Sequence, residues 1–407
     1  MGDINVLEGQ YVTAFAGRRD SYQVPLALCE SSRLASFVTS YYYKKEDSAL
    51  NYRLESLLPT SLNARRSSGI PDSLVRSLWR TELYEQLGRR LGCASHMYWK
   101  RIGLAISKEA ARIATRHRAN LLLYEPYASY AFKAEYPHHA HKKVLFHFHP
   151  HTLLEREIYA LDRIRHPISG DWLVNDAGGL LQPSESEHVW KYADKIICAS
   201  SFCKRSLVHV GVDERRISVI PYGVDCSNDI PINPSKSGFH AVFVGSGIQR
   251  KGLHTLLAAW RAAKLPRTSK LTIIARTIDP LMEEIASTTP NVQLSRGVSC
   301  NDLVSTYRAA DLLVVPSLVE GFGQVYLEAL SQGCPILGTP NTAVPDLGSE
   351  VDGVFCVPAS DVHSLAEMLQ RLAGELAGNL QIRERASLNA KRFSWTRFRA
   401  GIVDALS

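Results

Sequence analysis

The chain has 407 residues, of which 45% are hydrophobic and 21% are charged, and its formal net charge at pH 7 is +7. This length exceeds one typical hydrophobic core and suits two domains, and the composition excludes a disordered chain or a simple repeat array. No stretch approaches the roughly 20 apolar residues of a membrane helix, and the N-terminus lacks the basic and apolar regions of a secretory signal. We therefore expect a cytoplasmic protein with two globular domains.

The eight cysteines are dispersed, and no two of them stand in a Cys-x-x-Cys arrangement. This spacing argues against a zinc site and against a disulfide framework. We expect most of the cysteines to be free thiols in the protein interior.

Apolar strand-like runs alternate with helical patterns along most of the chain, which is typical of parallel sheets with crossover helices. In the first half we predict strands at 11–17, 34–43, 120–126, 143–150, 195–200 and 217–225. In the second half we predict strands at 241–247, 270–276, 291–297, 311–317, 335–339 and 354–358. Helices near 362–374 and 396–406 close the chain.

The segment 65–118 is rich in arginine and carries leucines at helical spacing, so it is a basic amphipathic region. Two interpretations are open. In the first, the apolar stripe packs into its own domain and the arginines are solvated. In the second, the region docks on an anionic membrane surface or on an acidic acceptor. Nucleic acid is disfavoured, because no recognisable nucleic-acid-binding module adjoins the region.

The segment 226–238 is polar and rich in proline and serine, so we predict a linker there. We accordingly divide the chain into a first Rossmann-like domain at 1–226, a second at 227–390, and a terminal helix at 391–407 that packs back on the first domain. Two such domains create a cleft at the carboxyl ends of their strands, where ligands bind in doubly wound sheets.

The sequence LVEGFGQVYLEAL sets Glu320 and Glu328 around the turn formed by Gly321, Phe322 and Gly323, between a predicted strand and a helix. Glycines there let the backbone approach an anion, and the first N–H groups of the helix attract phosphate oxygens. Glu328 could accept hydrogen bonds from ribose hydroxyls, and Glu320 could reach the sugar side of a diphosphate. The alternative is that one glutamate favours the helix start and the other is merely solvated.

A second glycine-rich turn, GSGIQRKG, offers Arg250 and Lys251 to the same predicted cleft. These cations could neutralise a diphosphate. One such turn is weak evidence, but two turns in one domain with complementary charges favour a nucleotide diphosphate site over solvated loop residues.

The sequence HFHPHT places His147, His149 and His151 around a predicted strand end. Alternate residues of a strand share one face, which raises a metal interpretation. Pro150 bends the chain, and no acidic or cysteine ligand adjoins the histidines in the sequence, so we do not expect a metal.

These motifs, together with GCPILGT after the glutamates, VIPYGVD before the linker and ADKIICASSFCKRSL, resemble the family 4 retaining glycosyltransferases of the two-domain GT-B fold. The resemblance covers residues 196–372 closely, whereas before Asn120 only the strand pattern agrees. It implies an α/β GT-B fold, a nucleoside diphosphate sugar donor, transfer with retention of anomeric configuration, and no metal ion or other cofactor in the site.

The resemblance also implies roles for residues of this chain. Arg250 and Lys251 would hold the diphosphate, Glu328 the ribose, and the backbone of Gly297 would approach the base. Glu320 would contact the donor sugar.

Among the three histidines, the resemblance makes His149 the best match to a histidine near the donor sugar, with His151 in reserve and His147 structural. We take His149 and Glu320 as the candidate catalytic residues.

The chain departs from the family pattern at two positions. Ser246 stands where an arginine often follows the first glycine of the second-domain loop, so diphosphate binding would depend more on Arg250 and Lys251. In the loop after the first strand only Gly17 remains of a usual glycine pair, and Arg18 and Arg19 follow it.

The sequence thus predicts a cytoplasmic, metal-independent transferase of the hexosyltransferase type that acts on a glycan or lipid-linked acceptor in surface polysaccharide or glycolipid assembly. Peripheral contact with the inner face of the membrane through 65–118 is one of the two interpretations of that region. The alternatives are a sugar-nucleotide epimerase or phosphorylase of similar fold, and a non-catalytic nucleotide-sugar-binding subunit.

Overall fold

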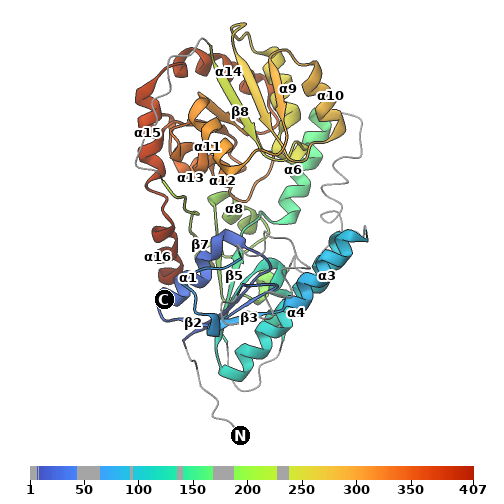
Figure 1. Cartoon of the computed structure of the whole chain (residues 1–407), viewed down its shortest axis with the longest axis vertical. Coiled ribbons are helices and arrows are strands. Elements are labelled where there is room, and N and C mark those ends of the chain that lie inside the picture. The colour runs from blue at the N-terminus through green and yellow to red at the C-terminus, as the bar shows by residue number, and fades with distance from the viewer. Residues whose placement is uncertain are drawn as a thin grey trace.

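The computed structural model describes residues 7, 9–43, 65–91, 95–134, 141–167, 188–226 and 238–407. The main part of the predicted linker, 227–237, lies outside the described residues. Figure 1 shows two layered bodies, one above the other, with the first half of the chain in the lower body and most of the second half in the upper.

Within the described residues, the first half forms a seven-stranded parallel sheet in the order β3-β2-β1-β4-β5-β6-β7. Its strands are β1 (Tyr11–Ala14), β2 (Leu34–Thr39), β3 (Val75–Ser77), β4 (Asn120–Tyr124), β5 (Lys143–His147), β6 (Lys195–Cys198) and β7 (Ile217–Val219). Central strands such as β4 and β5 are buried after their first residue and mostly apolar, because helices cover both faces of a parallel sheet. The sequence analysis missed β3, which has only three residues and an exposed arginine in its middle.

The described part of the second half forms a six-stranded parallel sheet in the order β10-β9-β8-β11-β12-β13. Its strands are β8 (His240–Val244), β9 (Lys270–Ile274), β10 (Val292–Ser295), β11 (Leu312–Val314), β12 (Ile336–Gly338) and β13 (Val354–Cys356). Each of them falls within or overlaps a predicted run. Two parallel sheets with flanking helices confirm the predicted α/β fold.

Helices connect the successive strands, as crossover connections require. In the first half they are α1 (Gln23–Glu30), α3 (Trp79–Arg90), α4 (Ser95–His117), α5 (Ser129–Lys133), α6 (Thr152–Arg165) and α8 (Ser201–His209). In the second half they are α9 (Leu253–Ala262), α10 (Pro280–Thr288), α11 (Cys300–Ala309), α12 (Gln324–Ser331), α13 (Val344–Leu347), α14 (Val362–Leu376), α15 (Leu380–Ala390) and α16 (Trp395–Ala405). Of these, α14, α15 and α16 follow the last strand.

The basic region contributes β3, α3 and the whole of α4. Ile102 and Ile106 of α4 are buried in the first domain, as the first interpretation of this region expects. Several of its arginines pair with acids, and Arg76 lies 2.9 Å from Glu109. Leu91, after the end of α3, is 77% exposed. No helix in the described ranges is both long enough and apolar enough to cross a membrane.

The last helix, α16, lies beside α1 of the first domain, as Figure 1 shows. Arg399 of α16 pairs with Glu30 at 2.7 Å and donates a second hydrogen bond of 2.7 Å to Gln23. Phe398 is buried against the rings of Phe146 and Tyr222. The chain therefore returns to the first domain after completing the second.

Candidate active site

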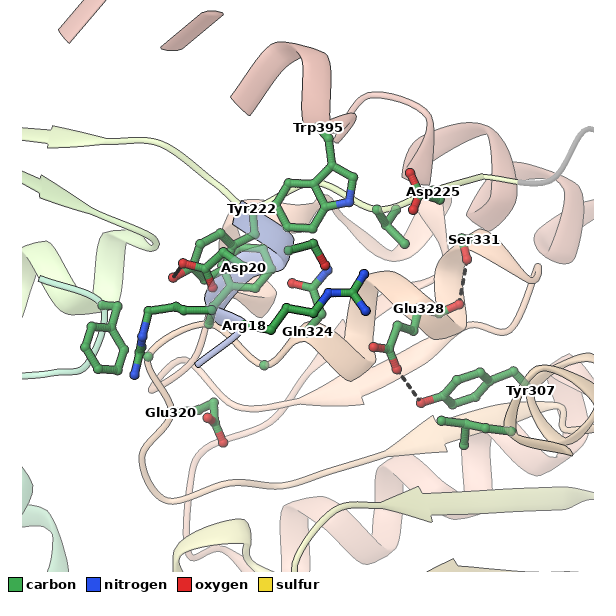
Figure 2. Close-up of a pocket in the computed structure, with 18 of the residues that line it drawn as sticks. Arg18, Asp20, Tyr222, Asp225, Tyr307, Glu320, Gln324, Glu328, Ser331 and Trp395 are labelled. Carbon is green, nitrogen blue, oxygen red and sulfur yellow. Dashed lines mark hydrogen bonds between the residues drawn. The ribbon is translucent and has the colours of Figure 1, made fainter. Parts of the chain in front are cut away.

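A cavity of about 680 Å³ opens between the two sheets, beside the ends of β1, β5 and β7 and the turns of the second domain. Figure 2 shows its lining, with residues of both domains around one space. Seven of the predicted site residues line it: His149, Arg250, Glu320, Gly321, Phe322, Gly323 and Glu328. The other three predicted residues, Gly17, Lys251 and Gly297, are not part of the lining.

The turn before α12 depends on its glycines for two different reasons. Gly323 has a φ of 87°, a left-handed conformation that L side chains rarely adopt. Gly321 lies so close to the first domain that a Cβ there would stand 1.9 Å from the carbonyl oxygen of Phe148. The carbonyl oxygen of Gly321 also accepts a 2.6 Å hydrogen bond from Ser200 of the first domain. The sequence argument for Gly321 considered only anion approach and missed this contact between the domains.

Glu320 forms ion pairs with both cations that were predicted to hold a diphosphate. Its Oε2 accepts a 3.1 Å hydrogen bond from Arg250 and a shorter one from Lys251. Burial acts to raise the pKa of Glu320, but Lys251 and Arg250 outweigh it and hold the pKa below its usual value. Glu320 is therefore ionised, and a diphosphate can gain these cations only by competing with its carboxylate.

Glu328 lies one turn into α12, and its Oε2 accepts a 3.2 Å hydrogen bond from the hydroxyl of Tyr307, as drawn in Figure 2. Burial raises the pKa of Glu328, and the Tyr307 bond only partly opposes this. Because one oxygen is fixed by Tyr307, the carboxylate keeps a defined orientation at the cavity wall.

His149 lines the cavity and is held by a buried acid behind it. Its Nδ1 lies 3.1 Å from Oε1 of Glu155, the side chain of which is fully buried. Burial acts to lower the pKa of His149, but Glu155 raises it more, so the net shift is upward. The side chain of His149 is 34% exposed, so its other face is open to a ligand.

The neighbouring histidines have other surroundings. Nδ1 of His147 lies 2.8 Å from Glu125, and this histidine is buried below the strand end. His151 caps α6, where its Nδ1 accepts a 3.3 Å hydrogen bond from the backbone N–H of Leu153. Although no acid directly adjoins these histidines in the sequence, Glu125 and Glu155 reach His147 and His149 from other elements.

Asp20, in the loop after β1, is a cavity residue that the sequence analysis did not single out. Its Oδ2 accepts hydrogen bonds from the hydroxyls of Tyr124, at 2.7 Å, and Tyr222, at 3.3 Å. Burial raises the pKa of Asp20. Asp20, Ser21 and Tyr22 all have positive φ angles of 46–65°, which costs non-glycine residues energy and is found at functional sites. The tyrosines come from distant strand ends, so no local sequence pattern identifies this group.

The two arginines of the same loop also face the cavity. The guanidinium of Arg19 lies 4.0 Å from the centroid of the Phe148 ring, over its face. Arg18 is exposed, and Figure 2 places it between Asp20 of the first domain and Gln324 and Glu328 of the second. The loop therefore brings a cation of the first domain to the same cavity that Arg250 of the second domain lines.

These features define the class of protein: two Rossmann-like domains face a charged cavity between the carboxyl ends of two parallel sheets, which is the arrangement of GT-B proteins. Residues 238–375 match the family model "Glycosyl transferases group 1", and residues 79–228 match the model "Glycosyltransferase Family 4". Together the two models cover more than half of the chain. The chain therefore belongs to the family 4 glycosyltransferases.

Individual relatives agree with this assignment. A D-inositol 3-phosphate glycosyltransferase of Saccharomonospora viridis is 38% identical over 104 residues, which are 25% of this chain and 24% of the relative. An MMP alpha-(1->4)-mannosyltransferase of Mycolicibacterium hassiacum is 26% identical over 41% of this chain and 42% of the relative. The first curated relatives are thus matched over only about a quarter of their length.

Solved structures show the fold over nearly the whole chain. Sucrose-phosphate synthase from Thermosynechococcus elongatus superimposes with a TM-score of 0.61 at 16% identity, over 97% of this chain and 98% of that one. Anabaena Alr3699/HepE, in complex with UDP and glucose, superimposes with a TM-score of 0.59 at 12% identity, over 98% and 99%.

Proposed function

We propose that this protein is a retaining glycosyltransferase that moves a hexose from a nucleoside diphosphate sugar to a glycan or lipid-linked acceptor. The observation that carries the proposal is the cavity that brings Glu320 with its cations, Glu328 with Tyr307, and His149 to one space between two sheets. The names of the relatives, a glycosyltransferase and a mannosyltransferase, and the UDP and glucose in the Anabaena structure support it.

The donor would lie along the second domain. Its ribose hydroxyls would donate to Glu328, and its diphosphate would lie at the N-terminus of α12, where unsatisfied backbone N–H groups attract phosphate. Arg250 and Lys251 would leave Glu320 and turn to the diphosphate, so that Glu320 becomes free to accept from hydroxyls of the donor sugar.

Arg18 would supply a further cation to the diphosphate from the first domain. Ser246 provides none at the second-domain loop, and Arg18 is exposed at the cavity with Glu328 and Gln324 facing it. A phosphate contact that requires the first domain would also favour the closed arrangement, which excludes water and so favours transfer over hydrolysis.

In the reaction, the bond between the anomeric carbon and the phosphate oxygen breaks, and a bond from the acceptor oxygen forms on the same face. The proton of the acceptor hydroxyl passes to the departing phosphate oxygen. The cations and backbone N–H groups stabilise the charge that grows on this phosphate. No carboxylate has to act as a nucleophile in this route, because the acceptor oxygen attacks the anomeric carbon directly. His149, held by Glu155, would donate a hydrogen bond to the donor sugar.

We further propose that the first domain docks on an anionic membrane surface through α3 and α4, which would suit assembly of a surface polysaccharide or glycolipid. Leu87 and Leu91 are exposed beside Arg90, and Leu104 of α4 is 44% exposed. Exposed apolar side chains next to arginines match the chemistry of an anionic lipid interface. Co-sedimentation with phosphatidylglycerol vesicles, but not with phosphatidylcholine vesicles, is expected, with loss in Leu87→Asp. Equal binding to both vesicles, or none, would contradict the proposal.

The function is tested by release of free nucleotide from a panel of UDP-, GDP- and ADP-sugars. One donor should be turned over by the native chain, and Lys251→Ala and Glu328→Ala should abolish this, whereas the exposed Lys264→Ala should not. The non-catalytic subunit would be favoured by a donor that binds the native chain but not Lys251→Ala, and that is not cleaved either with or without lipid acceptor extracts. Interconversion of the sugar without nucleotide release would favour the epimerase.

A further inference from the structure

A cluster of metal-ligand side chains lies outside the donor cavity, where the two domains meet. Asp162, near the end of α6, and His166, directly after it, are four residues apart on one side of that helix. His254 comes from the first turn of α9 in the second domain. Each residue offers one ligand atom, and the three atoms lie within 4.8 Å of one another. None of the three lines the donor cavity.

The position of α6 brings these residues together. Figure 1 shows α6 running between the two sheets, with one end beside α10 and the second sheet. Its residues Leu154, Ile158 and Tyr159 pack on Leu318 and Val319 of the second domain. Helix α6 follows a strand of the first sheet and contacts both domains, since its apolar cluster also includes Phe202 of the first domain. A bond from Asp162 or His166 to His254 therefore connects the domains.

We propose that Asp162, His166 and His254 form a binding site for a divalent transition metal ion, Zn²⁺ in particular, which fastens α6 of the first domain to α9 of the second. Two imidazoles and one carboxylate are ligands that Zn²⁺ takes, with water in the fourth position. The site would be structural and separate from the sugar-transfer chemistry.

The geometry suits an ion with little rearrangement. Nε2 of His254 lies 3.2 Å from Oδ1 of Asp162, close to the roughly 3.4 Å that separates two ligands of a tetrahedral zinc ion. The rings of His166 and His254 meet edge to face, with centroids 5.3 Å apart. The three ligand atoms are no more than 4.8 Å apart, so all of them lie within about 2.8 Å of a common centre. Zinc bonds to nitrogen and oxygen at about 2.0–2.2 Å, so each atom has to shift by less than about 1 Å.

Surrounding polar groups would orient the ligands, as is usual around bound metals. Asp162 accepts a 2.5 Å hydrogen bond from the hydroxyl of Ser360 and a short one from the amide of Gln249. Nε2 of His166 hydrogen-bonds to the carbonyl oxygen of Ser360 at 3.1 Å. The ion would bind either Nδ1, with this hydrogen bond kept, or Nε2, with this hydrogen bond broken. Asp162 is 1% and His254 is 4% exposed, so the ion would be largely shielded from water.

The proposal is tested by titrating the metal-free, untagged full chain with ZnCl2 in a calorimeter, and with CoCl2 while recording the visible absorption. We expect one zinc per chain, the visible bands of tetrahedral cobalt, and a higher Tm with zinc, because the ion binds only the folded chain. His166→Ala and His254→Ala should each lower zinc affinity at least tenfold and remove the cobalt bands. The control is His363→Ala, which removes a histidine that is 83% exposed.

Absence of stoichiometric zinc binding by the native chain would overturn the proposal. Zinc affinity in His166→Ala equal to that of the native chain and of His363→Ala would overturn it as well. His166 is only half-buried, so its replacement keeps the test decisive even if His254→Ala does not fold.

Discussion

Replacing Glu320 by glutamine should separate nucleotide binding from turnover, because this carboxylate pairs with Arg250 and Lys251, the two cations proposed to hold the diphosphate. The substitution keeps the shape of the side chain and removes its charge. The two cations would then be available to a diphosphate at once. We therefore expect free nucleoside diphosphate to bind more tightly, although the chain loses a residue proposed to contact the sugar.

The size of the effect follows from the burial of the pair. Fully exposed ion pairs are worth roughly 0.2–1 kcal/mol, and charge-assisted hydrogen bonds about 1.5–3 kcal/mol. The three side chains are 12–21% exposed, so we take about 1–2 kcal/mol for the competition that is removed. This corresponds to roughly 5–30-fold tighter binding of the diphosphate.

The assay is calorimetric titration of the nucleoside diphosphate that the donor panel identifies, beside turnover of the corresponding sugar donor. Glu320→Gln should show the tighter nucleotide binding together with a loss of kcat. The exposed Glu284→Gln is the control and should match the native chain in both. Unchanged or weaker nucleotide binding in Glu320→Gln would refute the view that this carboxylate competes with the diphosphate.

Three further predictions follow from the same cavity. Gly321→Ala places a Cβ 1.9 Å from the carbonyl oxygen of Phe148, so the two domains cannot approach as closely as they do here. We expect a lower Tm and little turnover, and a native Tm with native turnover would contradict this contact. Arg18→Ala should raise the Kd of the donor about 10- to 100-fold, the worth of one charge-assisted hydrogen bond, whereas the exposed Arg397→Ala should leave it unchanged. Because burial raises the pKa of Glu328, nucleotide affinity should be full above that pKa and be lost as the pH falls through it, at a higher pH than for an ordinary carboxyl. The pH profile of nucleotide Kd checks this, and a profile unchanged in Glu328→Gln would exclude that glutamate as its cause.

Much of the fold and part of the candidate site could be predicted from the sequence, because local patterns encode them. The glycine-rich turn before α12 and the following glutamate are neighbours in the chain, so their joint position at the cavity follows from the strand-to-helix pattern. The apolar runs likewise fixed the strands of the second sheet, whereas β3 is too short to give a pattern.

The missed features depend on residues far apart in the chain. Ser200 meets Gly321 across 121 positions, and Tyr222 meets Asp20 across 202. Gly297 does not line the cavity, so its approach to the base stays a prediction. The ion pair of Glu320 with Lys251 was also missed, because Lys251 was assigned to the diphosphate of the donor and Glu320 to its sugar.

The central claim is that the cavity transfers a sugar with retention of its anomeric configuration. The most direct measurement is a nuclear magnetic resonance assignment of the new glycosidic linkage, made with the donor that the panel identifies and the acceptor that receives its sugar. The account predicts an α linkage from an α-linked donor, formed by the native chain and not by Lys251→Ala. A β linkage from the same donor would contradict it.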